Sequence, residues 1–176
     1  EITERDWSSD VCSSDLKNCW RVNASRNTAR RLPVSQRFMF PSRTSLGRPL
    51  NAAVAACRYP PAGRRGYAAP AMRCSRYGFI TDYLSRANDE LLLITQIESD
   101  RAADAAEAIG GVDGVDMVFI GVNDMGGSIG RLEQLDRPDV RTVVAKAEAG
   151  IRRSGKLMGT VPSSGAGTLD LFAGGY

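Results

Sequence analysis

Residues 91–130 constrain the fold more than any other stretch of the chain. They contain two apolar runs, 91–97 and 117–122, separated by an alanine-rich segment with apolar residues on one helical face. Nearly continuous apolar runs are typical of strands that are buried on both faces of a parallel sheet. The stretch therefore predicts a strand, a helix and a second parallel strand, which is the repeating unit of an α/β protein.

Acidic residues follow both predicted strands. Glu98 comes directly after the first strand, and Asp124 lies just beyond the second. Neighbouring strands are about 5 Å apart, so carboxylates at equivalent strand ends can converge on one cation. Mg²⁺ commonly takes one or two carboxylates and leaves its other positions to water and substrate oxygens. Two solvated loop residues would give the same pattern, and spacing alone does not separate these alternatives.

The rest of the chain continues the alternation of helices and strands. A third strand is predicted at residues 156–161. A Gly-rich loop is predicted at residues 126–128, after the second strand. The predicted helices are amphipathic or rich in alanine, and they cover residues 51–58, 79–88, 101–109, 137–155 and 168–172. Short loops between such elements favour a parallel sheet with helical crossovers.

The loop at residues 62–66 presents two guanidinium groups, those of Arg64 and Arg65, between flanking Pro and Gly residues. An Arg fork is suited to bidentate binding of a carboxylate. A solvated basic loop explains the same residues, and from the spacing alone it is the simpler interpretation.

Composition excludes several classes of protein. The chain is 43% hydrophobic and 24% charged, which are globular values. It has no apolar run near the roughly 20 residues of a membrane span, and its start lacks the apolar core of a signal peptide. Its four cysteines lack CxxC spacing and it has no His, so we expect free thiols, no zinc site and a cytoplasmic location.

The first 50 residues do not follow the α/β pattern. Residues 6–16, DWSSDVCSSDL, match the peptide that one reading frame of a common sequencing-library adapter encodes, so we expect residues 1–16 to be a disordered artefact. Residues 17–50 lack any apolar period and predict irregular structure, from either out-of-frame DNA or a linker.

Because no Asp or Glu lies between Asp15 and Asp82, a basic nucleic-acid-binding arm is an alternative. The lack of an aromatic platform disfavours it, and we expect no nucleic-acid partner.

From about residue 51 onward the chain resembles the HpcH/HpaI aldolase/citrate lyase family. The resemblance rests on five pieces in the family's order and spacing: CRYPPAGRRG, RCSRYG, DYLSRANDELLLITQIES, VDGVDMVFIGVNDM and the strand around GKLMG. It implies a (β/α)8 TIM barrel, of which residues 51–176 would be the C-terminal part, roughly strands five to seven. The family's early strands with their catalytic His, and the last strand, are missing. We therefore expect a sheet with open edges and uncovered apolar faces, and an inactive fragment.

The family resemblance implies a class II, metal-dependent aldolase, a carbon–carbon lyase. The reaction would be reversible cleavage of 4-hydroxy-2-oxo acids to pyruvate and an aldehyde, by way of a metal-bound pyruvate enolate. The implied roles are metal binding (Mg²⁺, Mn²⁺ or Co²⁺) by Glu98 and Asp124, enolate stabilisation by Arg65, support of the metal's water by Gln96, and substrate binding by Arg65, Asn123, Asp124 and Val161. The family usually has Pro at the position of Val122 and Ser at that of Gly126.

The alternative within the superfamily is a lyase that resembles citrate lyase β or malyl-CoA lyase and acts on thioesters. The PPxGxRG loop and the QIES strand favour the aldolases that act on free oxo acids. Relatives of this family are usually hexamers, so the resemblance also implies a homo-oligomer.

Overall fold

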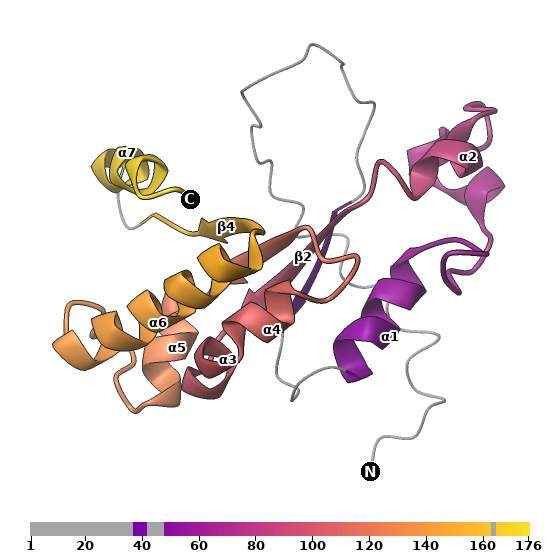
Figure 1. Ribbon diagram of the computed structural model, residues 1–176. Helices are drawn as coiled ribbons and strands as arrows, with labels where there is room; N and C mark the ends of the chain where they lie inside the picture. Colours follow the sequence, from indigo (N-terminus) through magenta and orange to yellow (C-terminus); the bar gives the residue numbers. More distant parts are fainter. Residues whose placement is uncertain (1–36, 42–47, 163–164) are drawn as a thin grey trace. The chain divides into compact units, whose positions relative to one another are not determined.

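A four-stranded parallel sheet forms the framework of the computed structural model, which describes residues 37–41, 48–162 and 165–176 (Figure 1). Its strands follow one another in space as in the sequence: β1 Arg37–Pro41, β2 Leu92–Ile97, β3 Met117–Ile120 and β4 Leu157–Thr160. All three neighbouring pairs are parallel. The predicted α/β class, with three parallel strands of a partial TIM barrel, is confirmed.

The fourth strand, β1, corrects the sequence prediction, because it lies inside the segment 17–50 that was expected to be irregular. It pairs with β2 along its whole length, from Arg37 opposite Leu92 to Pro41 opposite Gln96. Its five residues are too few to reveal a period by themselves, and a neighbouring strand supplies the backbone partners that define it. The other predictions for residues 1–36, including the adapter origin of residues 1–16, lie outside the described residues.

Seven α-helices connect and cover the described strands. They are α1 Arg48–Cys57, α2 Tyr83–Ala87, α3 Asp100–Asp104, α4 Ala106–Gly110, α5 Val122–Ser128, α6 Pro138–Ser154 and α7 Gly165–Ala173, and two short 3-10 turns, Ala69–Ala71 and Arg73–Ser75, precede α2. The helix predicted at residues 101–109 is divided at Ala105, whose backbone leaves the helical region (φ −98°, ψ 6°). Ser99 begins α3 by accepting a hydrogen bond from the amide of Ala102 on its Oγ atom, at 3.2 Å.

Helix α5 corrects a second expectation, since residues 126–128 were predicted to form a Gly-rich loop. Gly126 and Gly127 instead continue a helix that begins at Val122. A side chain at Gly126 would meet the carbonyl oxygen of Arg131 at 3.0 Å. Close packing against the following turn therefore outweighs the low helix propensity of glycine.

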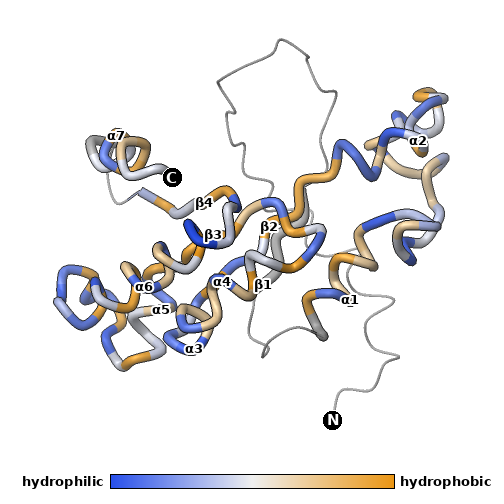
Figure 2. Tube along the Cα trace, viewed as in Figure 1, coloured by the Kyte–Doolittle hydropathy of each residue, from blue (hydrophilic) through white to orange (hydrophobic). Residues whose placement is uncertain are grey.

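One face of the sheet is buried along β2, β3 and β4. Its side chains alternate along the strands and are buried: Leu93, Thr95, Ile97, Val118, Ile120 and Met158. Helix α6 packs on this layer through Ala147 and Ile151, and the run of apolar residues along β2 is visible in Figure 2. This face supplies the core of the described residues.

The opposite face of the sheet is only partly covered. Met117, Phe119 and Gln96 on this face are half-buried, and Leu157 is 63% exposed. Within the described residues, β1 and β4 form the two edges of the sheet. No helix in residues 37–41, 48–162 and 165–176 combines the length and apolarity that a membrane crossing requires.

Candidate functional site at the carboxyl edge of the sheet

The carboxyl ends of β2, β3 and β4 lie at one edge of the sheet. Ile97 is opposite Ile120, and Ile120 is opposite Thr160. The residues that follow these positions are Glu98 after β2, Gly121 after β3 and Val161 after β4. In α/β sheets and barrels this edge is where ligands bind.

Gln96 and Glu98 point to the same side of β2, as their two-residue spacing predicts. The Gln96 amide donates a hydrogen bond from Nε2 to Glu98 Oε1 at 2.8 Å, and both side chains are half-buried. A neutral donor holds the carboxylate in one orientation without neutralising its charge. The pair is therefore suited to present a fixed anionic oxygen ligand.

Gly121 joins the end of β3 to this pair. Its amide donates to the carbonyl of Ile97 at 2.9 Å, which ties the two strand ends together. Its Cα lies so close to the pair that an added Cβ would be 2.9 Å from Gln96 Nε2 and 3.0 Å from Glu98 Cγ. The chain therefore passes directly over the Gln96–Glu98 contact before it enters α5.

Asn123 and Asp124 lie in the first turn of α5 and not in a loop. Both are exposed. Asp124 is three residues beyond Gly121, and residues at this spacing lie on neighbouring positions of a helical turn. The structure thus brings Gln96, Glu98 and Gly121 into contact and places Asp124 one turn away.

The carboxylates at this edge are of the chemical kind that a hard divalent cation prefers, and their joint role as metal ligands stays a prediction. Glu98 and Asp124 supply carboxylate oxygens, and a carboxylate in the first turn of a helix is favoured by the helix dipole. Among the described residues, no group of three or more His, Cys, Asp or Glu side chains is arranged to hold a metal. A set of two carboxylates is what Mg²⁺-type sites commonly use, with water and substrate completing the coordination.

Val161 follows β4 at the same edge and is 74% exposed. The hydroxyl of Thr160 donates to the carbonyl of Ile120 at 2.9 Å, which holds the end of β4 against β3. The position of Val161 is compatible with a wall of a substrate site, and that role stays a prediction.

Arg65, in contrast, lies near the other end of β2. Its guanidinium carbon is 4.5 Å from the centre of the Tyr59 ring. The backbone of Tyr59 is held by Asn88, which accepts from the Tyr59 amide at 2.8 Å and donates to its carbonyl at 3.2 Å. Asn88 precedes β2, whereas Glu98 follows it, and six strand residues span about 20 Å. The described residues therefore do not bring Arg65 to the carboxyl edge.

The surroundings of Arg65 form an aromatic cluster of Cys57, Tyr59, Arg65, Cys74 and Tyr83. The rings of Tyr59 and Tyr83 meet edge to face at 6.2 Å, and the Cys74 thiol lies 3.1 Å from the Tyr83 hydroxyl. Burial raises the pKa of the Cys57 thiol to about 11, although the positive charges of Arg65 and Arg58 oppose the shift. Burial, followed by the contact with Cys74, also raises the pKa of Tyr83. Sequence analysis missed this cluster, because Cys74 and Tyr83 come from two segments outside the motif that holds Cys57, Tyr59 and Arg65, and the cluster spans 26 positions.

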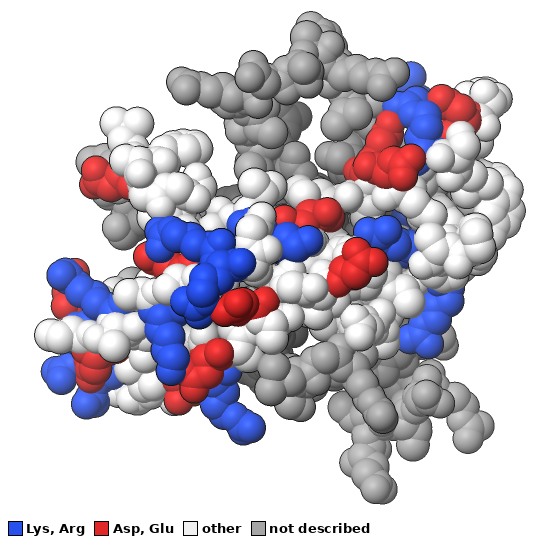
Figure 3. All heavy atoms as spheres, viewed as in Figure 1, with Lys and Arg blue, Asp and Glu red and all other residues white. Residues whose placement is uncertain are grey.

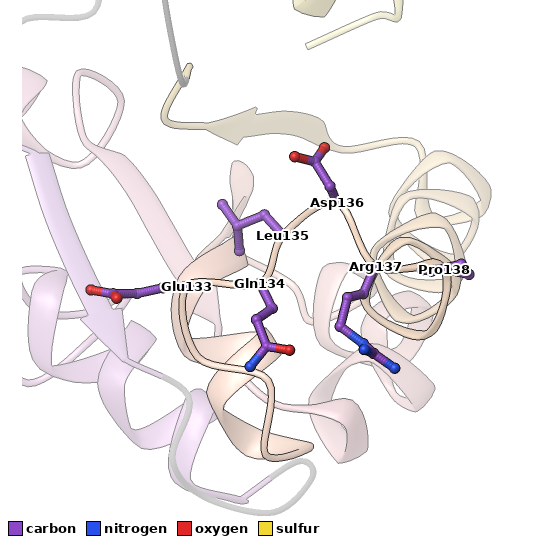
Figure 4. A pocket seen from close by; sticks show the side chains of 6 residues that line it. All are labelled: Glu133, Gln134, Leu135, Asp136, Arg137 and Pro138. Carbon is purple, nitrogen blue, oxygen red and sulfur yellow. The ribbon is translucent and has the colours of Figure 1, made fainter.

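A pocket of about 400 Å³ lies elsewhere, on the loop before α6 (Figure 4). Its lining residues come from one stretch of chain, 133–138, and include none of the predicted site residues. Two of its charged groups are engaged in ion pairs, Asp136 with Arg141 at 2.9 Å and Arg137 with Asp139 at 3.2 Å. The carboxyl edge of the sheet, which holds the predicted site residues, is therefore a better candidate for the functional site than this pocket.

Charges of both signs are mixed on the face of the molecule shown in Figure 3. Arg153 pairs with Glu107 at 2.6 Å and Arg152 with Glu148 at 3.2 Å.

Comparison with known proteins decides the family. The family described as HpcH/HpaI aldolase/citrate lyase matches residues 21–166. The chain belongs to this family. The matched range begins inside the segment 17–50, for which the sequence suggested a linker or out-of-frame peptide.

The curated relatives are similar over part of their length. A 2-keto-3-deoxy-L-rhamnonate aldolase of Klebsiella pneumoniae is 43% identical over 106 residues, which cover 60% of this chain and 40% of the relative. The protein of the same description from Escherichia coli (strain K12 / DH10B) is 40% identical over 106 residues, with the same coverage. The chain thus spans about two fifths of the length of these relatives.

Solved structures show the same fold. An HpcH/HpaI aldolase/citrate lyase family protein from Burkholderia cenocepacia J2315 superposes with a TM-score of 0.69 and 34% identity, over 80% of this chain and 55% of that one. An HpcH/HpaI aldolase from Desulfitobacterium hafniense DCB-2 gives a TM-score of 0.65 with 25% identity, over 79% and 54%. The four described strands are therefore part of a barrel fold.

Proposed function

We propose that the complete protein is a metal-dependent lyase that reversibly cleaves 4-hydroxy-2-oxo acids to pyruvate and an aldehyde. The observation that carries the proposal is the contact between Gln96 and Glu98 at the carboxyl edge, 2.8 Å long, with Asp124 in the adjoining helical turn. A carboxylate held in place by an amide is a fixed ligand, and the edge is the one where α/β enzymes bind substrate.

Glu98 and Asp124 would hold the divalent cation, Mg²⁺, Mn²⁺ or Co²⁺. When bound, the cation supplies Lewis acidity toward the keto oxygen of the substrate and orients that oxygen. Gln96 keeps the Glu98 carboxylate in its binding orientation. The backbone of Asn123 and Asp124 would receive the substrate carboxylate, and Val161 would supply an apolar contact at the end of β4.

Arg65 has a different role in this proposal from the one that the family resemblance implied. Its guanidinium lies over the ring of Tyr59, at the opposite end of β2 from Glu98. This position supports a role in packing the connection between α1 and β2. Contact between Arg65 and the keto oxygen has no support from its place in this chain.

The substrate class is inferred from the relatives. Curated proteins 40–43% identical to this chain are described as 2-keto-3-deoxy-L-rhamnonate aldolases. A 2-keto-3-deoxy sugar acid is a 4-hydroxy-2-oxo acid, and its cleavage between carbons 3 and 4 yields pyruvate and an aldehyde. These relatives favour free oxo acids over the thioesters of the alternative lyases.

A chimeric enzyme tests the proposal. The 106 matched residues of this chain replace their counterparts in the Klebsiella pneumoniae relative. We expect Mg²⁺- or Mn²⁺-dependent release of pyruvate from 2-keto-3-deoxy-L-rhamnonate, and loss of that release in the chimera with Glu98→Gln. A folded chimera that cleaves only malyl or citryl thioesters would favour the alternative lyase. A folded chimera without either activity would contradict the proposed function.

A further inference from the structure

Gly121 is the residue at the carboxyl edge that the sequence did not single out. An ideal Cβ at this position would lie 2.9 Å from Gln96 Nε2, 3.0 Å from Glu98 Cγ and 3.6 Å from Glu98 Oε1. The first two distances are shorter than ordinary contacts, which lie at about 3.5–4.0 Å, whereas the third is an ordinary contact. The space that a methyl group would need is therefore occupied by the Gln96–Glu98 pair.

Backbone conformation does not require glycine at this position. Gly121 has φ −86° and ψ 83°, and residues with side chains accept this negative φ. It is also the N-cap of α5, where Ser, Thr, Asp and Asn are the preferred residues, and it makes no side-chain capping bond. Local preferences thus favour a side chain, so the close approach to the neighbouring strand is what explains its absence.

We propose that Gly121 is a positioning residue for the metal site, because its missing side chain leaves the slot in which the Gln96 amide holds the Glu98 carboxylate. The inference rests on the proposed function. The atom nearest to an added methyl group is the end of the flexible Gln96 side chain, which can move away at little cost to the fold. Gly121→Ala therefore disturbs the orientation of Glu98 more than it disturbs folding.

Mn²⁺ binding to the full chain, measured by calorimetric titration, tests this role. Groups that orient a metal ligand typically contribute about 10–100-fold in affinity. We expect Gly121→Ala to weaken Mn²⁺ binding by about 10-fold or more, with an unchanged Tm of the metal-free chain. Gly127→Ala is the matched control. It adds a methyl to the same helix, 3.2 Å from the end of the exposed Leu132 side chain, and should leave Mn²⁺ affinity unchanged.

The outcomes separate the two proposals. Unchanged Mn²⁺ affinity in Gly121→Ala would overturn the positioning role and leave the metal site standing. Absence of Mn²⁺ binding by the wild-type chain would overturn the metal site itself. In that case the ¹⁵N NMR signal of the Gln96 side-chain amide, recorded on the metal-free chain, tests whether Gly121 positions the Gln96–Glu98 pair. We expect this signal to shift in Gly121→Ala and to stay in place in Gly127→Ala, and an unshifted signal in both would refute the role.

A double substitution tests whether Gly121 acts through the Gln96 side chain. In a Gln96→Ala background the atom nearest to the new methyl is gone. Adding Gly121→Ala to this background should weaken Mn²⁺ binding less than it does in the wild-type chain, because the shorter of the two tight contacts, that with Gln96 Nε2, is gone while the one with Glu98 Cγ remains. If the second substitution costs as much there as in the wild-type chain, Gly121 does not act through Gln96.

Discussion

The two ends of β2 have opposite surroundings. At the start of the strand, Tyr59 and Cys57 are 5% and 3% exposed, and an aromatic ring stacks against the guanidinium of Arg65. At the end of the strand, Gln96 and Glu98 are only half-buried, and a glycine replaces the side chain that would cover them. A packed end stabilises the connection between α1 and β2, whereas a polar, open end can bind a ligand. Substitutions at the start of β2 should therefore change mainly the free energy of unfolding. Substitutions at its end should change mainly the affinity for Mn²⁺.

The largest expected effect is on stability, at the start of β2. Tyr59→Ala removes a buried ring and should lower the free energy of unfolding by about 3–5 kcal/mol. Mn²⁺ affinity of the molecules that remain folded should not change. Urea unfolding monitored by circular dichroism measures the loss. The matched control is Tyr67→Ala, because Tyr67 is 67% exposed, and it should change stability by less than about 0.5 kcal/mol. Equal effects of the two substitutions would contradict the packing role of the cluster.

The next largest effect should appear at the end of β2, in metal binding. Glu98→Gln keeps an oxygen that accepts the hydrogen bond from Gln96 but removes the charge of a ligand. We expect Mn²⁺ affinity to fall by more than the roughly 100-fold that an orienting group contributes, with little change in Tm. Glu133→Gln, at an exposed position outside this edge, is the control. If Glu98→Gln and wild type bind Mn²⁺ equally, Glu98 is not a ligand.

A third effect depends on pH and belongs to the start of β2. The folded chain keeps the Cys57 thiol neutral up to about pH 11, whereas the unfolded chain loses that proton from about pH 9. The stabilising contribution of this burial is complete below pH 9 and is lost between pH 9 and 11. The stability difference between wild type and Cys57→Ala should therefore shrink by about 1 kcal/mol between pH 8 and 10. A difference that is constant with pH would show that this thiol titrates normally in the folded chain.

The smallest expected change in stability concerns Arg65. It is the most direct test of whether this residue belongs to the packed start of β2 or to the candidate site at its end. Arg65→Met keeps the length of the side chain and removes the charge above the Tyr59 ring. We expect a loss of about 0.5–1 kcal/mol in the free energy of unfolding, typical of a cation–π contact near the surface. The pKa of Cys57 should rise further, because Arg65 lowers it. In the chimeric aldolase, a large loss of activity with normal stability would instead support the role at the keto oxygen that the family resemblance implied.

Much of the framework could be predicted from local patterns. The strands at residues 91–97, 117–122 and 156–161 were found because continuous apolar runs are visible within a few residues. The shared orientation of Gln96 and Glu98 follows from the two-residue period of a strand, and the 2.8 Å contact between them confirms it. The partial barrel followed from the order of these pieces.

Other features depended on residues that are distant in sequence. Strand β1 is defined by its pairing with β2, more than 50 positions away, and its own five residues carry no clear period. The glycines of α5 suggested a loop, but packing against Arg131 makes them helical. The conspicuous PPxGxRG motif suggested a catalytic Arg65, while the contact between Tyr59 and Asn88 places it near the start of β2.

The sequence by itself therefore determined the α/β class, the strand positions and the acidic residues that follow two strands, because these depend on short-range periodicity. Only the tertiary structure decided which of the candidate residues lie together. Strand register placed Glu98 beside Gly121, and the backbone bonds of Tyr59 held Arg65 at the opposite end of β2. These contacts depend on packing and on hydrogen bonds between segments that are distant in sequence, so a local sequence pattern does not predict them.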